Sequence, residues 1–461
     1  MSDPGSPLLE LNYDRGSLVL QGGFPAGGGG WPEYLNRDER IGGWRCLALH
    51  YRALITWLTR SGLAFRDQAR QYGELPLNAS GFPEPFPHQS EALAVWRKAH
   101  WGMIELPTGA GKTQLALLAM AAIARDTLIL VPTLDLMAQW SNVLESFLGV
   151  QPGMIGGGRH DLRPVTVSTY ASAYRKGEHF GHRFGLAIFD ECHHLGGEGF
   201  AHIAEILIAP YRIGLSATVE RPDNRHRLLD SLIGPVVYRR SINELSGRYL
   251  ADYRTEIIEA DLTPQEREEY EACRRVYLDF AHSRNLAPSS GDGWRRFVFA
   301  AARSQEGREA LEAYRRQRRI ALTPASKLGI LRDLLLRHRA ERVLIFTNDN
   351  RTAYEIAQGF LLPIITHQTR ISERRTILEN FKDGHWPFLV TSRVLNEGVD
   401  VPTVNVAVVV SGTASVREHV QRLGRILRRA PGKEAVLYEI LSSTPGERSV
   451  SRRRREHDAY R

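Results

Sequence analysis

Cysteine is scarce in this sequence of 461 residues, where three thiols stand far apart at Cys46, Cys192 and Cys273. No pair has the C-x-x-C spacing of zinc and redox sites, so the sequence argues against a disulfide framework and indicates a reducing compartment. The run Cys192-His193-His194 contains metal-ligating residue types. Because adjacent side chains rarely converge on one ion, we do not expect a metal site there.

Long apolar runs are also missing from the sequence. No segment approaches the roughly 20 apolar residues needed to span a bilayer, and the first residues lack the basic and then apolar pattern of a signal sequence. We therefore expect a cytoplasmic protein without a membrane partner. At a usual size of roughly 100–200 residues per domain, the length indicates two to four domains.

Positive charge is in excess, at a formal net value of +8. Arginine supplies most of it, while lysine is confined to scattered positions such as Lys98, Lys112 and Lys176. Arginine forms bidentate pairs with phosphate and stacks on bases, so this bias suits a nucleic-acid partner. A G+C-rich genome would produce the same bias, and composition alone leaves both explanations open.

The most specific motif is a glycine-rich segment, Leu106-Pro107-Thr108-Gly109-Ala110-Gly111-Lys112-Thr113. In such a loop, consecutive backbone N–H groups curl around phosphate oxygens at a helix N-terminus, and a lysine adds a charge for the β- and γ-phosphates. Leu106 stands where the strict pattern has its first glycine, and glycine-rich turns before helices also arise by chance. The predicted nucleotide ligands are Thr108, Gly109, Ala110, Gly111, Lys112 and Thr113.

An apolar run over residues 187–189 predicts a buried strand that ends at Asp190 and Glu191. In phosphoryl transfer, one such carboxylate holds Mg²⁺ and another group orients the attacking water. Thr113 and Asp190 are therefore the predicted Mg²⁺ ligands, and Lys112, Asp190 and Glu191 are predicted catalytic residues. The two motifs together indicate a site for ATP and Mg²⁺ rather than a chance turn.

Strand and helix patterns alternate along most of the chain. Short buried-strand candidates recur from residue 127 to residue 215, and a second set runs from residue 343 to residue 441. This alternation predicts an α/β fold with two doubly wound parallel sheets. Ahead of them, alternation over residues 8–20 predicts a β-hairpin, helical spacing from Leu47 to Leu58 predicts a helix, and a proline-rich hinge follows at residues 82–87.

Between the two predicted sheets lies a polar, helical stretch. Thr263-Pro264-Gln265-Glu266 has the pattern of a capping box with proline at the first helical position. A turn-rich tip at residues 288–293 precedes a second predicted helix, which starts with Trp294, Arg295 and Arg296. This helical hairpin either grips DNA by stacking and phosphate contact or packs its own aromatic core. The basic run at residues 452–455 is either solvated or a phosphate contact.

Near the end of the second set, Gln421, Arg425 and Arg428 stand at i, i+4 and i+7, on one face of a predicted helix. Arginines on such a face can stabilise charge on the transferred γ-phosphoryl group, and their origin in another domain would make hydrolysis depend on domain closure. The alternative is an exposed helix that carries surface arginines. We predict that all three residues are catalytic.

The motifs taken in order resemble those of superfamily 2 helicases, and within them the XPB (xeroderma pigmentosum group B) family in its archaeal and bacterial form. Besides the two nucleotide motifs, the resemblance rests on these segments: Val131-Pro132-Thr133, Ser168-Thr169-Tyr170, Ser216-Ala217-Thr218, Ile345-Phe346-Thr347, residues 396–402 and residues 421–428. It implies a damage-recognition-like α+β domain (1–80), a RecA-like lobe (81–240), a bridge with a helical thumb-like hairpin (241–322), a second RecA-like lobe (323–445) and a basic tail (446–461).

The resemblance also implies roles for single residues. Gln89 would read the adenine, Gly398 and Asp400 would contact the nucleotide, and nucleic acid would meet these residues: Thr133, Ser168, Thr169, Arg221, Trp294, Arg295, Arg296 and Thr391. Two positions depart from the family pattern. Pro222 replaces the acidic residue of a loop implicated in strand separation, and Phe86 replaces the arginine expected before Gln89.

The activity that the resemblance implies is that of an ATP-dependent DNA helicase or double-strand DNA translocase with 3′ to 5′ polarity. It would act on forked or duplex DNA in repair of the nucleotide excision type, with a helicase-associated nuclease as a partner. Three alternatives stay open. They are an ATP-switched DNA clamp that recruits a nuclease, the motor of a restriction-type defence system, and an RNA helicase.

Overall fold

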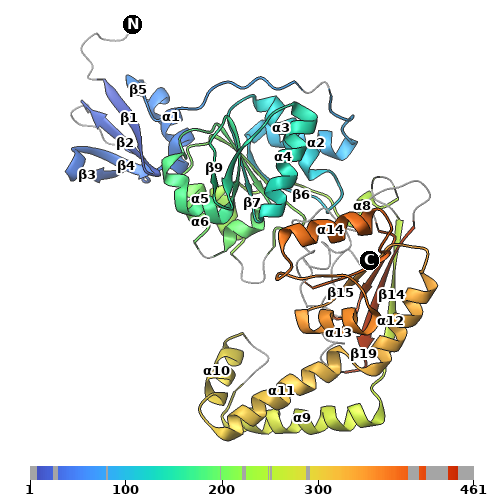
Figure 1. Ribbon diagram of the computed structural model, residues 1–461. Coiled ribbons are helices and arrows are strands. Elements are labelled where there is room, and N and C mark those ends of the chain that lie inside the picture. Colours follow the sequence, from blue (N-terminus) through green and yellow to red (C-terminus); the bar gives the residue numbers. More distant parts are fainter. Residues whose placement is uncertain are drawn as a thin grey trace. The chain divides into compact units, whose positions relative to one another are not determined.

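The structure is a computed structural model that forms two compact units, one up to Glu244 and one from Leu245 onward. It describes residues 8–23, 30–78, 81–197, 199–220, 225–247, 249, 252–286, 291–392, 404–411 and 434–444. Figure 1 shows the helices and strands of both units.

The first unit begins with a small sheet whose strand order is β3-β4-β2-β1-β5. Its elements are β1 (Leu9–Asp14), β2 (Ser17–Gly22), β3 (Asn36–Asp38), the 3-10 helix η1 (Glu39–Ile41), β4 (Gly43–Leu47), η2 (Ala48–His50), α1 (Tyr51–Arg60) and β5 (Phe65–Asp67). The predicted hairpin is confirmed, because β1 and β2 pair antiparallel around Arg15 and Gly16, which both have positive φ as a type I′ turn requires. The predicted helix is α1, although Leu47 belongs to β4.

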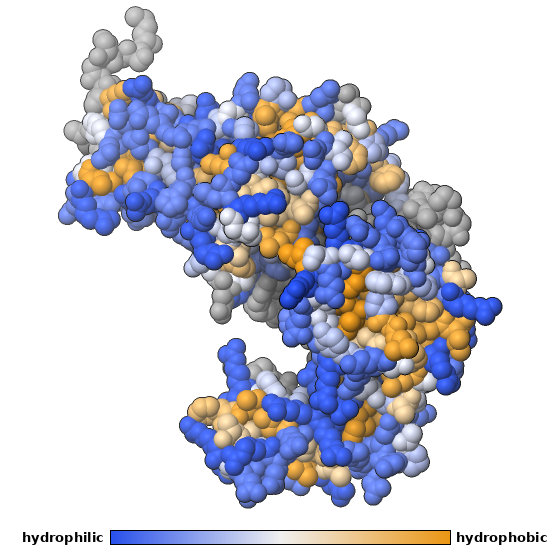
Figure 2. Space-filling view, in the orientation of Figure 1, coloured by the Kyte–Doolittle hydropathy of each residue, from blue (hydrophilic) through white to orange (hydrophobic). Residues whose placement is uncertain are grey.

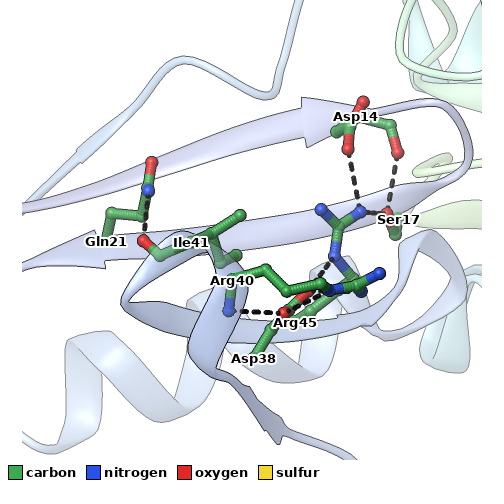
Figure 3. A network of polar contacts seen from close by, with 7 residues as sticks. All are labelled: Asp14, Ser17, Gln21, Asp38, Arg40, Ile41 and Arg45. Atoms are coloured by element: carbon green, nitrogen blue, oxygen red, sulfur yellow. Dashed lines mark hydrogen bonds and ion pairs between the residues drawn. The ribbon is translucent and has the colours of Figure 1, made fainter.

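A network of charged groups ties the strands of this sheet together (Figure 3). The Asp38 carboxylate accepts from Arg40 Nη2 at 2.8 Å and from Arg45 Nε at 3.2 Å. Arg45 also donates to Asp14 and Ser17, at the hairpin turn. Hydrogen bonding to Arg40 lowers the pKa of Asp38 to about 2. Asp38 therefore joins η1 to β4, and Arg45 extends the network to the hairpin.

The small domain packs on the lobe that follows it in the same unit. Leu54 and Leu58 of α1 enter a core with the inner face of the sheet, and Ile208 of the lobe is part of the same cluster. The Tyr13 hydroxyl donates to Ile206 O at 3.0 Å. The opposite face of α1, with Arg52 and Arg60, is exposed.

The lobe contains an eight-stranded sheet in the order β13-β6-β12-β11-β7-β10-β8-β9. Its strands are β6 (Trp101–Glu105), β7 (Thr127–Val131), β8 (Gly153–Gly156), β9 (Arg159–His160), β10 (Val165–Thr169), β11 (Leu186–Asp190), β12 (Tyr211–Ser216) and β13 (Val236–Arg239). Its helices are α2 (Pro87–Ala99), α3 (Lys112–Ile123), α4 (Leu134–Leu148), α5 (Tyr170–Lys176), η3 (Gly177–His179), η4 (Cys192–Gly196), α6 (Ala201–Glu205), α7 (Arg227–Leu232) and α8 (Ile242–Leu245).

All described strand pairs of this sheet are parallel except β8 with β9, which confirms the predicted doubly wound arrangement. Right-handed crossovers put α3 and α4 on one face and α5 and α6 on the other (Figure 1). The central strands are buried along their whole length, as parallel strands covered on both faces must be.

The second unit contains a six-stranded sheet in the order β14-β19-β18-β15-β17-β16. Its elements are β14 (Asp252–Ala260), α12 (Ala325–Arg337), β15 (Val343–Phe346), α13 (Asn350–Phe360), β16 (Ile364–Ile365), α14 (Ile371–Lys382), β17 (Phe388–Thr391), β18 (Val406–Val409) and β19 (Glu434–Ser442). The described pairs are parallel, so the second predicted sheet is confirmed. Sequence analysis did not predict β14, an edge strand rich in polar residues that pairs with β19.

The helical stretch between β14 and α12 is a three-helix extension, not the two-helix hairpin predicted from sequence. Its helices are α9 (Pro264–Ser283), α10 (Gly291–Ala301) and α11 (Gln305–Leu322). The chain runs out along α9 and returns along α11, with α10 at the outer end (Figure 1). The predicted capping box at Thr263 and Glu266 is confirmed by both of its hydrogen bonds.

Aromatic residues form the core of this extension. Phe297 is fully buried and packs near Tyr277, Phe280 and Tyr314, and the half-buried Trp294 stacks on Phe297 at 5.5 Å. These contacts support the packing alternative for the aromatic side chains. Hydrophobic groups are also visible at the surface of the outer end, beside hydrophilic ones (Figure 2). No helix of the described ranges is both long and apolar enough to cross a bilayer.

Candidate functional site

Three neighbouring strands of the first lobe bring the nucleotide motifs together. The glycine-rich loop follows β6, the acidic pair lies at the end of β11, and Ser216 ends β12, which lies between them. Because these strands are parallel, their carboxyl ends meet at one edge of the sheet, where ligands bind in open α/β sheets. The sequence-predicted residues Lys112, Asp190 and Glu191 therefore share one site.

The phosphate loop is held by a buried glutamine. Gln89 is fully buried in α2, and its Nε2 donates to Gly111 O at 3.0 Å while its Oε1 accepts from Phe86 N at 2.8 Å. Gly111 has φ 84°, and a Cβ there would lie 2.0 Å from Gln89 Nε2. Glycine is therefore required at this position. The structure places Gln89 as a support of the loop, and its contact with adenine stays a prediction.

The lysine of the loop faces the acidic pair. Lys112 is the first residue of α3, and its Nζ lies 4.0 Å from Glu191 Oε1 and donates to Leu106 O at 3.2 Å. Two buried polar atoms near this point, Thr108 Oγ1 and Glu191 Oε2, have no hydrogen-bond partner among the described residues. Since buried polar groups are normally satisfied, these atoms fit a site that a phosphate and a water complete on binding.

The Asp190 carboxylate is buried and accepts two hydrogen bonds. Trp140 Nε1 donates to Oδ2 at 2.8 Å, and Glu191 N donates to Oδ1 at 3.0 Å. Burial, followed by the charge of Glu191, raises the pKa of Asp190 to about 6. Glu191 itself has φ 48°, a left-handed conformation that turns the chain sharply after the strand. A carboxylate destabilised in this way is suited to hold a cation.

The acidic pair is linked to the end of the next strand. The Ser216 hydroxyl donates to Thr218 O at 2.9 Å, so it accepts from His193 Nδ1 at 2.9 Å. The His193 Nδ1 atom also lies 3.5 Å from Glu191 Oε2. These contacts connect the segment after β11 with the end of β12.

Sequence analysis did not identify two residues that position Asp190. Trp140 lies on the buried face of α4, and the Tyr170 hydroxyl in α5 donates to Asp190 O at 3.0 Å. Both are aromatic residues on the apolar face of their helix, and this is the ordinary sequence pattern of a core residue. Their contacts with Asp190 depend on how the helices pack on the sheet.

Comparison with known proteins places the chain in a family. Residues 82–221 match the family "Type III restriction enzyme, res subunit", and residues 326–430 match "Helicase conserved C-terminal domain". Residues 11–69 match "Xeroderma pigmentosum group B helicase damage recognition domain". The chain is 39% identical to "DNA 3'-5' translocase XPB2" of Sulfurisphaera tokodaii over 97% of its own length and 100% of that protein. The chain belongs to the XPB helicase family.

Other XPB relatives are longer. The chain is 33% identical to "DNA 3'-5' helicase XPB" of Mycobacterium tuberculosis over 74% of its own length and 57% of that protein. The helicase domain of Pyrococcus furiosus Hef has a similar fold, with a TM-score of 0.52 at 19% identity over 80% of this chain and 97% of that one. The similarity to this helicase domain agrees with the predicted fold of two parallel-sheet lobes.

The nucleic-acid candidates expected from the XPB resemblance lie at strand ends. Thr133 and Thr169 cap α4 and α5 through their hydroxyls, whereas Ser168 and Thr391 are fully buried and donate to backbone oxygens. The side chains of Ser168 and Thr391 are thus used inside the protein, so contact with DNA from these segments would come from neighbouring backbone groups.

In the helical extension, Arg295 and Arg296 are exposed while Trp294 is half-buried. The remaining predicted site residues lie outside the residues that the structure describes: Arg221, Gly398, Asp400, Gln421, Arg425 and Arg428. Their roles stay predictions.

Proposed function

We propose that this XPB-family protein is an ATP-driven DNA helicase or translocase that moves 3′ to 5′, as the names of its relatives indicate. The observation that carries the proposal is the acidic pair, buried Asp190 and half-buried Glu191, near Lys112 at the carboxyl edge of the first sheet. The full-length similarity to the Sulfurisphaera translocase supports DNA as the track.

The site residues divide the work of hydrolysis. Backbone N–H groups of the loop and Lys112 bind the phosphates, and Glu191 accepts a proton from the attacking water. Thr113 and Asp190 would hold Mg²⁺, which when bound supplies positive charge for the phosphate oxygens. Trp140 keeps the Asp190 carboxylate in place through its hydrogen bond, and Lys112 Nζ lies 4.0 Å from Glu191 Oε1.

Gln421, Arg425 and Arg428 are proposed to complete catalysis from the second lobe, as their one-sided spacing suggests. Under this proposal Arg425→Ala and Arg428→Ala each lower DNA-stimulated turnover and weaken nucleotide binding only slightly. Wild-type turnover in both variants would show that the second lobe adds no catalytic arginine.

The match of residues 11–69 to a damage-recognition domain supports a role in repair. We extend the proposal to work with a nuclease, which would cut the strand that this motor exposes. Addition of such a nuclease to a forked-duplex reaction should then raise cleavage only when ATP is hydrolysed. Equal cleavage with Glu191→Gln would oppose a motor role in that step.

Strand displacement on duplex DNA with one single-stranded arm tests the proposal directly. The wild-type chain should release the labelled strand when the single-stranded arm has a 3′ end and not when it has a 5′ end. Glu191→Gln should bind ATP and displace nothing, because the general base is lost. Glu145→Gln is the matched control, since Glu145 is exposed on α4. Displacement with either arm would contradict the polarity.

A further inference from the structure

A cavity of about 710 Å³ lies in the first unit, between the small domain and the lobe. One wall is the outer face of α1, with Arg52, Ala53, Trp57 and Arg60. The other wall includes Trp101, the first residue of β6. The nucleotide site does not use this groove, because none of its residues line it. Its volume is in the range of pockets that hold a nucleotide-sized ligand.

Indole rings dominate the apolar part of the groove. Trp57 and Trp101 are half-buried and line opposite walls. Trp57 also contacts other aromatic residues of the small domain. Its ring lies 4.9 Å from that of Trp31, and Trp31 stacks on Trp44 at a ring distance of 4.8 Å and an interplanar angle of 16°. The Arg212 guanidinium, fully buried, lies 4.8 Å from the Trp101 ring. These neighbours hold both indoles in fixed positions, as a stacking platform requires.

The charged part of the groove is positive. Arg52 and Arg60 are exposed, and the described lining contains no carboxylate. Arg52 Nη1 donates to Ala99 O at 2.8 Å, which fixes its stem across the groove while other guanidinium N–H groups stay available. Within the described ranges Arg60 has neither an ion pair nor a hydrogen bond from its side chain. Two guanidinium groups without an acidic neighbour suit phosphate.

We propose that this groove binds a segment of single-stranded DNA, with an unpaired base stacked between Trp57 and Trp101 and the flanking phosphates on Arg52 and Arg60. The inference rests on the proposed function, which makes DNA the substrate. Rings that stack and guanidiniums that bind phosphate are the two elements of single-strand recognition. A peptide without acidic groups would use the rings alone and would leave two cations unpaired. The groove thus gives the small domain and the lobe a shared DNA contact outside the motor site.

A pocket-filling variant tests the stacking part. Ala53 is exposed and lines the groove, so Ala53→Phe places a ring inside it without removing a core side chain. The probes are fluorescein-labelled oligothymidylate of twelve residues and the same oligomer with abasic sites, measured by anisotropy on the full chain without nucleotide. Ala53→Phe should weaken binding of oligothymidylate about tenfold. It should change binding of the abasic oligomer no more than about twofold, since the phosphate contacts remain.

A charge variant tests the phosphate part. Arg60→Glu should weaken both oligomers about tenfold and reduce the slope of log affinity against log salt by about one. Arg66→Glu is the matched control, because Arg66 is exposed on β5 and does not line the groove, and it should bind as wild type does. DNA-independent ATP turnover, which should be unchanged in all three variants, verifies that each one folds.

The outcomes separate this inference from the function on which it rests. If wild type fails to bind either oligomer and forked DNA does not stimulate its ATP turnover, the proposed function is wrong. If wild type binds and Ala53→Phe and Arg60→Glu bind equally well, DNA lies elsewhere and the groove inference is overturned. Ala53→Phe would also overturn the groove inference if it weakened binding of the abasic oligomer as much as binding of oligothymidylate, because the lost affinity would then not come from a stacked base.

Discussion

Replacement of Asp190 by Asn should stabilise the nucleotide-free protein although it disables the ATP site. Asp190 is buried at the end of β11, next to the charge of Glu191. Burial is the largest reason why its pKa rises from 3.8 to about 6. The fold therefore opposes ionisation of this carboxyl group, and an uncharged amide of the same shape removes that opposition.

The size of the effect follows from the two pKa values. At 1.36 kcal/mol per pH unit, the difference between 3.8 and about 6 corresponds to about 3 kcal/mol when the group is fully ionised. An amide keeps one acceptor for Trp140 Nε1 but loses the bond from Glu191 N, which offsets about 1 kcal/mol. A net gain of about 2 kcal/mol raises the melting temperature of a unit of this size by about 4–8 °C.

The pH dependence has a definite sign. Because the folded pKa lies above the unfolded one, the wild-type protein is most stable with the carboxyl protonated and loses that stability as the pH rises from about 4 through about 6. The advantage of Asp190→Asn should thus be complete at pH 8 and should shrink as the pH falls from 6 towards 4.

Thermal unfolding at pH 8 and at pH 4.5, without nucleotide or DNA, measures this difference. Asp230→Asn is the control, since Asp230 is exposed on α7, and it should melt within about 1 °C of wild type at both values. If Asp190→Asn melts at or below the wild-type temperature at pH 8, the argument that the ionised Asp190 carboxylate destabilises the folded protein is refuted.

Three further predictions concern the motor. Trp140→Phe removes the hydrogen-bond donor to Asp190, so steady-state ATP turnover should fall about tenfold. Nucleotide affinity, measured by titration with a fluorescent nucleotide, should stay within about threefold of wild type. Unchanged turnover would show that Trp140 is a core residue only. Gln89→Ala should weaken ATP and GTP equally if it supports the loop, and a selective loss for ATP in competition titrations would assign it to adenine. Arg295→Ala with Arg296→Ala should flatten the salt dependence of DNA binding if the extension grips DNA, and an unchanged slope would assign it to packing or partner docking.

Local sequence patterns predicted the parts of the site that depend on one segment of chain. The glycine-rich loop, the strand before Asp190 and the capping box at Thr263 each have a spacing set by their own chemistry, and the structure contains all three. The β1–β2 hairpin was predictable for the same reason, because its turn requires residues that accept positive φ.

Contacts between distant segments were not predictable in this way. The bond from Trp140 to Asp190 joins residues 50 positions apart, and nothing near Trp140 marks it as different from a core residue. β14 contains three consecutive polar residues, Arg254, Thr255 and Glu256, so it lacks the alternation typical of a half-buried strand, and it becomes a strand through its pairing with β19, more than 170 residues later. By contrast, Ser304 caps α11, so the third helix of the extension had a start signal that sequence analysis could have used.

ATP turnover by the wild-type chain and by Glu191→Gln, measured without nucleic acid and with single-stranded, duplex and forked DNA and with RNA, tests the central claim most directly. A DNA motor with Glu191 as general base should be stimulated by DNA more strongly than by RNA, and Glu191→Gln should lose at least two orders of magnitude under every condition while it still binds ATP. Turnover that ignores DNA, or a Glu191→Gln variant that hydrolyses ATP at the wild-type rate, would contradict it.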